Sequence, residues 1–335
     1  MRRHVTPAQP TPTHGVEYRN ATPADLPACG DVWRDALNDY LGRLNLPLIP
    51  PDVASIARLH AHLLATDPER FVVAVREGGR GDERDRDRRN ESGVIAFGAA
   101  VRRGDLWFLS MLFVRPGEQG VGVGRALLAR ILPDDAAILG TATDSAQPIS
   151  NALYASYGIV PRVPLLGFVG RPTDAGAIEP LPAGVTATPF EALAAGPPTG
   201  SGHRELVAAI DALDSDAIGF SHPQDHRFLR LEGRVGFLYR AAGGDAVGYG
   251  YTSAAGRVGP VAVRDPDLLP GVLGHLLTVI EPRGASAVWV AGSADVAVVA
   301  LLRAGLRLDG FPVLLCWTRP FGDLRRYIPI SPGLL

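Results

Sequence analysis

Apolar residues in the first half of the chain recur with helical spacing in some segments and form continuous runs in others. Thr22 precedes Pro23 at the start of a segment with apolar residues every three or four positions, which predicts a capped helix. A second helix is expected at about 52–65. Apolar runs typical of strands occupy 71–75, 93–101 and 106–114.

The same pattern continues to residue 170 and ends in a Pro- and Gly-rich linker. Alternating helices and strands are expected, in order, at 124–132, 136–143, 149–158 and 163–170. Gly158 is a suitable residue to end its helix. Residues 76–93 carry charges of both signs and no large apolar residue, which favours a solvated loop over a basic docking arm.

The second half of the chain repeats the pattern of the first. Aligned on their apolar positions, Val114 falls on Val263 and Gly158 on Gly305, and an Arg-Pro pair ends both halves. Because separated segments match at nearly constant spacing, a tandem duplication is predicted. The expected parts are a disordered tail, two domains and a C-terminal tail, at 1–15, 16–172, 181–320 and 321–335.

Composition excludes several classes of protein. The chain has 33 Lys and Arg against 35 Asp and Glu, which argues against a nucleic-acid or membrane partner. Its only cysteines, Cys29 and Cys316, are far apart, so neither a disulfide scaffold nor a cysteine zinc site is expected. The N-terminal segment lacks the apolar run of a secretory signal, and a cytoplasmic protein is predicted.

A glycine-rich motif, Gln-Gly-Val-Gly-Val-Gly at 119–124, lies between the strand at 106–114 and the helix at 124–132. Arg125 stands where a dinucleotide fingerprint needs glycine, and no lysine follows as in a Walker loop. Glycines let an anion approach the backbone, and the first N–H groups of a helix bind anions. The motif therefore predicts a site for a compact anion such as a pyrophosphate.

At these residues the chain resembles the GNAT N-acetyltransferase superfamily. The family motif, Gln or Arg followed by x-x-Gly-x and then Gly or Ala, is met in full by residues 119–124. The Val-x-Pro step at Val114 and the Asn-x-x-Tyr pattern of Asn151 and Tyr154 also match the family. The resemblance implies an α/β (α+β) fold of two tandem GNAT-like domains, each a mixed, mostly antiparallel sheet flanked by helices. The layout is similar to that of the mycothiol synthases, where the competent half is the C-terminal one, whereas here it is the N-terminal one.

The resemblance also assigns roles to residues. Backbone groups of Leu112, Phe113 and Val114 would pair with the pantetheine arm of coenzyme A. The pyrophosphate would be held by the backbone of Gln119, Gly120, Val121, Gly122, Val123, Gly124 and Arg125. The side chains of Arg115 and Arg125 would add charge, and that of Asn151 would contact the pantetheine arm. No metal is expected.

Tyr154 would act as the catalytic acid that protonates the departing thiolate. No general base is assigned, although residues of a suitable type are present: Asp35, Asp39, His60, His62, Glu118 and Asp144. The acceptor pocket is expected from residues 40–52, residues 106–114 and the C-terminal half.

The second half has lost the motif. Apolar residues stand at the positions of Gln119, Gly120, Gly124, Asn151 and Tyr154, namely Leu268, Leu269, Leu273, Val298 and Leu301. This half is therefore expected not to bind coenzyme A. Its His-Pro-Gln-Asp-His segment at 222–226 offers metal-ligand types, but a polar loop is favoured.

These patterns predict an acetyl-CoA-dependent N-acetyltransferase in which a small-molecule amine attacks directly in a ternary complex. The alternative is a non-catalytic acyl-CoA binding or sensing protein. A purely structural role is disfavoured because the motif is intact in one half and lost in the other. The sequence does not identify the amine or the oligomeric state.

Overall fold

The computed structural model describes residues 14–76, 93–173, 175–194 and 200–335. Contacts divide the chain into two compact units: one contains residues up to 102 and 107–137, the other 103–106 and 138–335. The predicted loop at 76–93 and nearly all of the predicted tail at 1–15 lie outside the described residues. The domain bounds derived from the repeat stay predictions, because this division by contacts follows packing rather than duplication.

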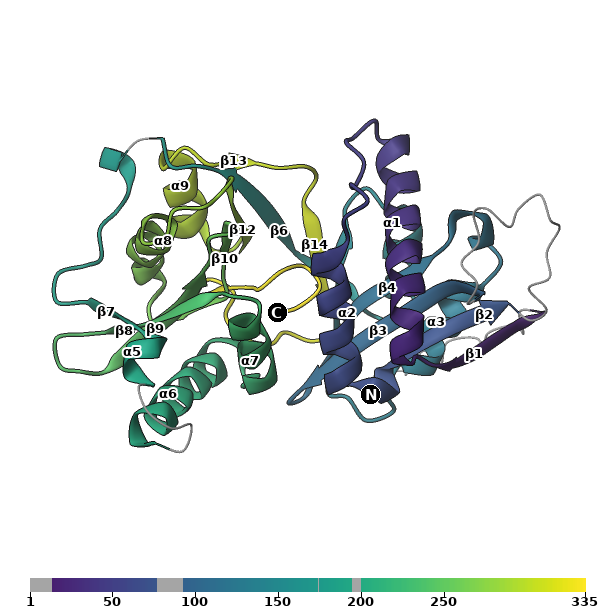
Figure 1. Ribbon diagram of the computed structural model, residues 1–335, viewed down its shortest axis with the longest axis horizontal. Coiled ribbons are helices and arrows are strands. Elements are labelled where there is room, and N and C mark those ends of the chain that lie inside the picture. The colour runs from purple at the N-terminus through teal and green to yellow at the C-terminus, as the bar shows by residue number, and fades with distance from the viewer. Residues whose placement is uncertain (1–13, 77–92, 174, 195–199) are drawn as a thin grey trace. The chain divides into compact units, whose positions relative to one another are not determined.

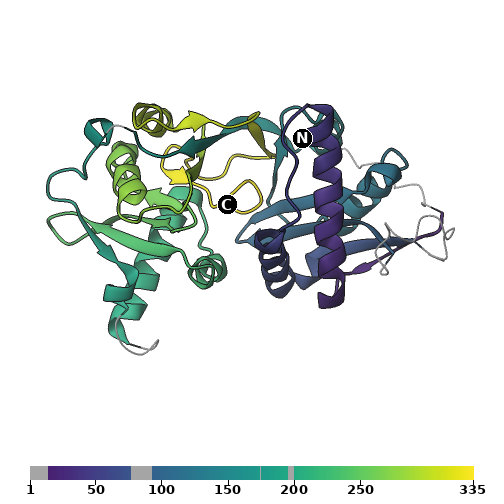
Figure 2. The same ribbon diagram turned by 45° about the horizontal axis from the view of Figure 1, so that its top comes forward.

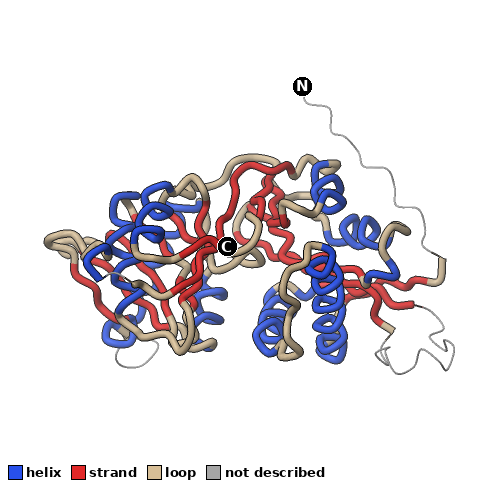
Figure 3. The backbone as a smooth tube through the Cα atoms, turned by 90° about the horizontal axis from the view of Figure 1, so that it is seen from above, coloured by secondary structure: helices blue, strands red, loops and turns tan. Residues whose placement is uncertain are grey.

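The first unit is a sheet in the order β1-β2-β3-β4 with helices on both faces (Figures 1 and 3). Its elements are β1 (Val16–Asn20), α1 (Leu26–Arg43), α2 (Ala54–Thr66), β2 (Phe71–Arg76), β3 (Val94–Arg103), β4 (Leu106–Val114) and α3 (Val123–Ile131). The helices α1 and α2 lie side by side over one face, as Figure 2 shows, and α3 covers the other. Phe71, Phe97 and Trp107 are fully buried in its core.

The second unit contains the remaining elements. Its strands are β5 (Ile138–Asp144), β6 (Val160–Gly170), β7 (Thr186–Pro189), β8 (Val235–Arg240), β9 (Ala246–Thr252), β10 (Arg257–Val258), β11 (Val261–Val263), β12 (Ser286–Ala291), β13 (Arg307–Leu308), β14 (Val313–Trp317) and β15 (Tyr327–Ile328). Its helices are α4 (Pro148–Ala155), α5 (Phe190–Leu193), α6 (Ser201–Ile218), α7 (Pro223–Leu231), α8 (Leu269–Thr278) and α9 (Asp295–Arg303).

Strands of the two sequence repeats pair with each other through the long strand β6 and the segment 307–317. The first part of β6 pairs with β14, which also pairs with β5, so that β14 from the second repeat lies between two strands of the first. The last part of β6 pairs with β12 and β13 of the second repeat. This exchange explains why contacts group residues 138–172 with the second unit.

A five-stranded sheet in the order β15-β11-β9-β8-β7 completes the second unit. In β9, glycines alternate with Tyr249 and Tyr251, so the two tyrosines share one face. That face packs on α6 and α7, because His226 on α7 stacks on Tyr251. The glycine face packs on α8, since a Cβ at Gly250 would meet Leu276 at 2.6 Å.

The helices and strands expected up to residue 170 are all present within a few residues of their predicted bounds. The order of elements repeats as well. A short 3-10 turn precedes both α3 and α8, at Pro116–Glu118 and Pro266–Leu268. The predicted tandem organisation of two similar α/β domains is thus confirmed. The predicted polar loop at 222–226 is wrong, because His222 caps helix α7 and the side chains of His222, Asp225 and His226 are buried.

Candidate functional site

The glycine motif forms the turn between β4 and α3, as predicted. Gly120 and Gly122 have φ angles of 82° and 95°, a left-handed conformation that glycine adopts at little cost. Gly122 is the N-cap of α3. The chain therefore needs glycine at these two positions to turn sharply from strand into helix.

Gly124 is different, because no described part of the chain requires glycine there. It lies in the first turn of α3, outside the left-handed region, and a Cβ would stand 3.5 Å from Val114 Cγ2, an ordinary contact. Glycine in a helix costs about 0.5–1 kcal/mol relative to alanine. A destabilising residue without an intramolecular reason is expected where another molecule approaches the backbone.

The amides of residues 120–125 are available to such a molecule. Within the part of the chain that the structure describes, these N–H groups donate to no backbone carbonyl. The first turn of a helix leaves its N–H groups without intrahelical partners and carries a partial positive charge. Together with the exposed backbone of the turn, they form a cradle suited to a phosphate or pyrophosphate.

Side chains around the turn hold it in place. The Gln119 side chain donates to the Val114 carbonyl at 3.0 Å. The Arg115 guanidinium donates to the Asp35 carboxylate at 2.6 Å and to the Val94 carbonyl at 3.2 Å. Arg115 is therefore placed to anchor β4 to α1, whereas Arg125 is exposed at the start of α3.

The end of β4 brings Leu112, Phe113 and Val114 to the turn. All three are half-buried, and the Phe113 ring lies 5.8 Å from that of Phe97. Their side chains thus fix the strand whose backbone was predicted to pair with a pantetheine arm.

Asn151 lies on α4 in the second unit and has one unused polar atom. Its Nδ2 donates to the carbonyls of Asp144 and Gln147, at 3.0 and 2.8 Å. These two bonds fix the orientation of the amide. Its Oδ1 is buried and accepts no hydrogen bond from any described residue. A buried acceptor without a donor is costly, so Asn151 fits a ligand that brings an N–H group.

Tyr154 follows one turn later on α4 and is only 5% exposed. Burial raises the pKa of its phenol well above the usual value, and the nearby Cys316 adds to the shift. The phenol therefore keeps its proton throughout the neutral range, as a catalytic acid must. The higher pKa also widens the gap to a thiol, which has a pKa near 8.5 in general.

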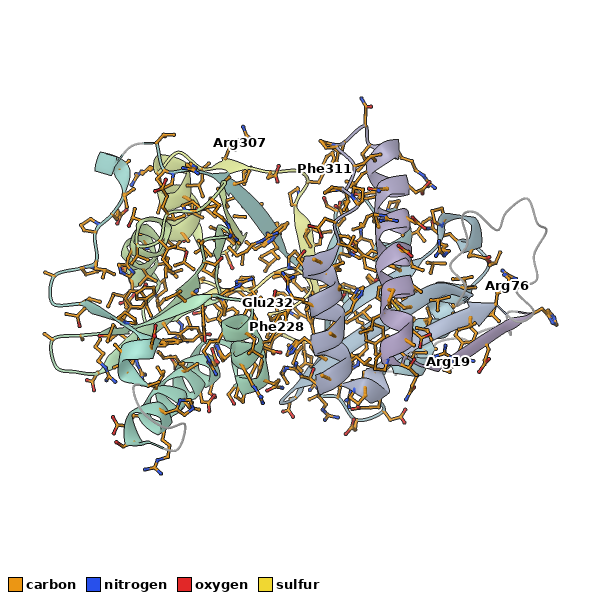
Figure 4. The ribbon with its side chains drawn as sticks, viewed as in Figure 1. Arg19, Arg76, Phe228, Glu232, Arg307 and Phe311 are labelled. Carbon is orange, nitrogen blue, oxygen red and sulfur yellow. The ribbon has the colours of Figure 1, made fainter. Side chains whose placement is uncertain are left out.

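The residues considered as bases are mostly engaged. Asp35 pairs with Arg115, Asp39 with Arg43 at 2.5 Å, and Glu118 with Arg76, which Figure 4 labels on β2.

His60 is fully buried on α2, with Nε2 3.2 Å from Met111 Sδ, and burial lowers its pKa to about 4. It is therefore a neutral core histidine.

No family model and no curated protein matches this sequence, but solved structures do. An acetyltransferase candidate from Pyrococcus horikoshii superposes with a TM-score of 0.70 at 13% identity, over 98% of this chain and 99% of that one. A GCN5-related N-acetyltransferase from Sphaerobacter thermophilus superposes with a TM-score of 0.58 at 19% identity, over 94% of this chain and 99% of that one.

A tandem GNAT protein from the clavulanic acid biosynthesis pathway gives a TM-score of 0.51 at 16% identity, over 91% of this chain and 99% of that one. The chain has the tandem GNAT fold. Within it, the glycine motif belongs to the first GNAT-like half.

The corresponding region of the second GNAT-like half is filled by the chain itself. Leu269, Leu273 and Leu301, which stand at the positions of Gly120, Gly124 and Tyr154 in the first half, are at most 1% exposed. The linker covers the start of α8, where a Cβ at Gly271 would stand 2.6 Å from the Pro180 carbonyl. The hollow beside it is lined by Glu179, Asp267, Pro270, Asp295, Val296, Val299 and Arg303. With three carboxylates and one arginine, the lining carries net negative charge and would repel a polyphosphate.

The strand β11 of this half is also occupied. It corresponds to residues 112–114 of β4, and the C-terminal strand β15 pairs with it, Ile328 opposite Val261 and Tyr327 opposite Ala262. The chain's own tail therefore takes the backbone positions that the resemblance assigns to a pantetheine arm in the first half.

A buried polar network surrounds the predicted His-Pro-Gln-Asp-His segment. Asp214 faces both His222 and His226. Burial alone would lower the pKa of His222, but Asp214 and Asp225 raise it to about 9. Burial would likewise raise the pKa of Asp214, but His222 and His226 lower it to about 2. Sequence patterns did not identify Asp214, because it lies on α6 and not on α7. The sequence feature that could have indicated a buried polar network is the alternation of glycines with Tyr249 and Tyr251 in β9, since these tyrosines contact Asp214 and His226.

Across the described residues, no helix is both long and apolar enough to span a bilayer.

Proposed function

We propose that this protein is an acetyl-CoA-dependent N-acetyltransferase that acts on a small-molecule amine through its N-terminal half. The observation that carries the proposal is Gly124, a helical glycine for which the protein has no internal need. The same position in the second half holds the buried Leu273. The tandem GNAT fold and the cradle of free amides support the proposal.

Acetyl-CoA supplies an acetyl group activated as a thioester. The amides of residues 120–125 bind its pyrophosphate, with Arg125 adding positive charge. The buried Oδ1 of Asn151 accepts a hydrogen bond from an amide N–H of the pantetheine arm. The amides of residues 120–125 thus fit a pyrophosphate, and the acceptor atom of Asn151 fits an amide, and coenzyme A carries both groups.

Tyr154 holds the proton that the departing thiolate takes up, because its buried phenol stays protonated at neutral pH. The amine attacks directly, so the protein contributes mainly by positioning the reactants and by stabilising the charge that develops on the carbonyl oxygen.

One observation favours the non-catalytic alternative. Tyr154 is 5% exposed and lies beside Cys316 in the core, as expected of a structural tyrosine. In that case the first half binds an acyl-CoA as a sensor and transfers nothing.

The test is calorimetric titration of the full-length protein with acetyl-CoA, with Gly124→Leu as the variant. Gly243→Leu is the matched control, since that glycine also has an ordinary φ and open space around it. One-to-one binding that Gly124→Leu abolishes and the control retains supports the coenzyme site. An amine screen with the wild type and Tyr154→Phe then separates enzyme from sensor. Lack of binding at millimolar acetyl-CoA would refute both.

A further inference from the structure

Four buried side chains converge inside the second unit from three separate segments. Asp214 comes from α6, His222 and His226 from the start of α7, and Tyr327 from the C-terminal strand β15. Their exposed fractions are 0%, 0%, 2% and 0%. Figure 1 shows α6 and α7 next to each other, and Figure 4 marks α7 by Phe228.

The atoms that face one another have the spacing of a ligand set. Asp214 Oδ2 lies 2.8 Å from His226 Nε2 and 3.3 Å from His222 Nε2, and the Tyr327 hydroxyl lies 3.3 Å from His222 Nε2. One ligand atom from each of Asp214, His222 and His226 lies within 4.8 Å of the others. Tetrahedral zinc with bonds of about 2.0–2.2 Å separates its ligand atoms by about 3.3 Å.

The opposite side of each group is also arranged as in metal sites. His226 Nδ1 lies 3.0 Å from the Tyr251 hydroxyl, and Tyr249 donates to Asp214 Oδ1. His222 Nδ1 has no hydrogen bond within the described residues, but Asp225 Oδ2 stands 3.6 Å away. Metal-binding histidines usually donate their second ring N–H to such a carboxylate, which fixes the ring and its tautomer.

The buried charges of this cluster leave one carboxylate that a cation could neutralise. Arg103, which contacts place in the same unit, donates to both oxygens of Asp225 at 2.7 and 2.8 Å and so neutralises it. Asp214 then remains as a buried carboxylate facing two histidines. An extra proton on His222 can balance it, and so can a divalent cation if Tyr327 binds as the phenolate and releases its proton to solvent. The mutual approach of ligand atoms from Asp214, His222 and His226, with the Tyr327 hydroxyl 3.3 Å from His222 Nε2, favours the metal.

We propose that Asp214, His222 and His226, with Tyr327 as the fourth ligand, form a closed structural site for a divalent cation of the zinc type. Two nitrogens and two oxygens suit zinc, and a site with no exposed ligand has no open position for a substrate. Because Tyr327 lies on β15, the metal would fasten the C-terminal strand to α6 and α7. This role is independent of the proposed transferase activity.

The first test is elemental analysis of the full-length protein after dialysis, followed by removal and return of zinc alone. One equivalent of zinc per chain, and a melting temperature that falls with a chelator and recovers with zinc, support the site. Less than about 0.1 equivalent, together with no zinc-dependent shift of the melting temperature, would overturn it in favour of a proton on His222.

The second test uses cobalt as a spectroscopic probe in Asp214→Asn and His226→Gln. His203→Gln on the same helix α6 is the matched control, outside the convergent group. The wild type and the control should show the intense visible absorption of tetrahedral cobalt, and the two ligand variants should bind cobalt more than about tenfold more weakly. Equal cobalt affinity in all four proteins would place any metal elsewhere.

Discussion

Replacing Gly124 by alanine should stabilise the protein while weakening its binding of coenzyme. The new Cβ would stand 3.5 Å from Val114 Cγ2, with no clash, and the residue lies in helix α3. Alanine in place of a helical glycine stabilises by about 0.5–1 kcal/mol. The added methyl group would lie beside the amides proposed to bind the pyrophosphate, so acetyl-CoA affinity should fall, but less than in Gly124→Leu, because the resembled motif allows alanine at this position.

Gly274→Ala in α8 is the matched perturbation in the second half. There a Cβ would stand 2.3 Å from the Glu179 carbonyl oxygen and 2.9 Å from Ile178 Cγ2. Forcing a methyl into packed surroundings costs about 1–3 kcal/mol, which exceeds the gain in helix propensity. This variant should melt at a lower temperature than the wild type and bind acetyl-CoA unchanged.

The assay combines thermal unfolding followed by circular dichroism with calorimetric titration of acetyl-CoA. A change of 1 kcal/mol shifts the melting temperature of a domain of this size by roughly 2–8 °C. If Gly124→Ala lowers the melting temperature, then the protein itself needs glycine there, and the argument that a ligand requires it fails. Unchanged affinity in a stabilised Gly124→Ala would equally refute the argument.

Three further predictions follow from single interactions. Tyr154→Phe should keep acetyl-CoA binding and lower kcat at least tenfold, as measured by release of free thiol, because it removes the proposed proton donor. Arg103→Met should destabilise the protein by about 3–5 kcal/mol in urea unfolding, since it removes the guanidinium that neutralises the buried Asp225; a loss below 1 kcal/mol would contradict this. A hydrogen bond from Arg19 lowers the pKa of Asp25 from 3.8 to about 2, so Asp25 contributes stability above pH 4 that is lost as the pH falls toward 2. Acid unfolding should therefore show a difference between wild type and Asp25→Asn at neutral pH that shrinks over that range.

The elements of the first half were predictable because their apolar patterns are regular and their ends carry Pro or Gly. Gly120 and Gly122 show the strength of this reasoning, since both have the left-handed conformation that a sharp strand-to-helix turn requires. Gly124 could be singled out from the repeat alone, by comparison with Leu273. The structure then supplied the reason, namely that no atom of the residues it describes excludes a side chain there.

Long-range features could not be predicted from one sequence. The strand β14 pairs with β5 and β6 of the first repeat. This pairing depends on which strand edge is left unpaired by the rest of the fold, and no local sequence pattern determines it. Arg115 was expected to face a phosphate, but the carboxylate of Asp35, 80 residues away, holds it. The network around His222 was underestimated because its partner Asp214 lies on another helix and Tyr327 near the C-terminus.

The two halves differ in ways that reinforce one another. In the second half, Leu269 and Leu273 fill the volume beside α8, the linker carbonyls of Glu179 and Pro180 cover its first turn, and β15 pairs with β11. Restoring a glycine at Leu273 alone would open a cavity under a linker that still excludes an anion. In the first half, the N–H groups of residues 120–125 donate to no backbone carbonyl of a described residue, and Gly120 and Gly122 are exposed. We therefore expect coenzyme binding in the first half to depend as much on this uncovered helix start as on the glycines themselves.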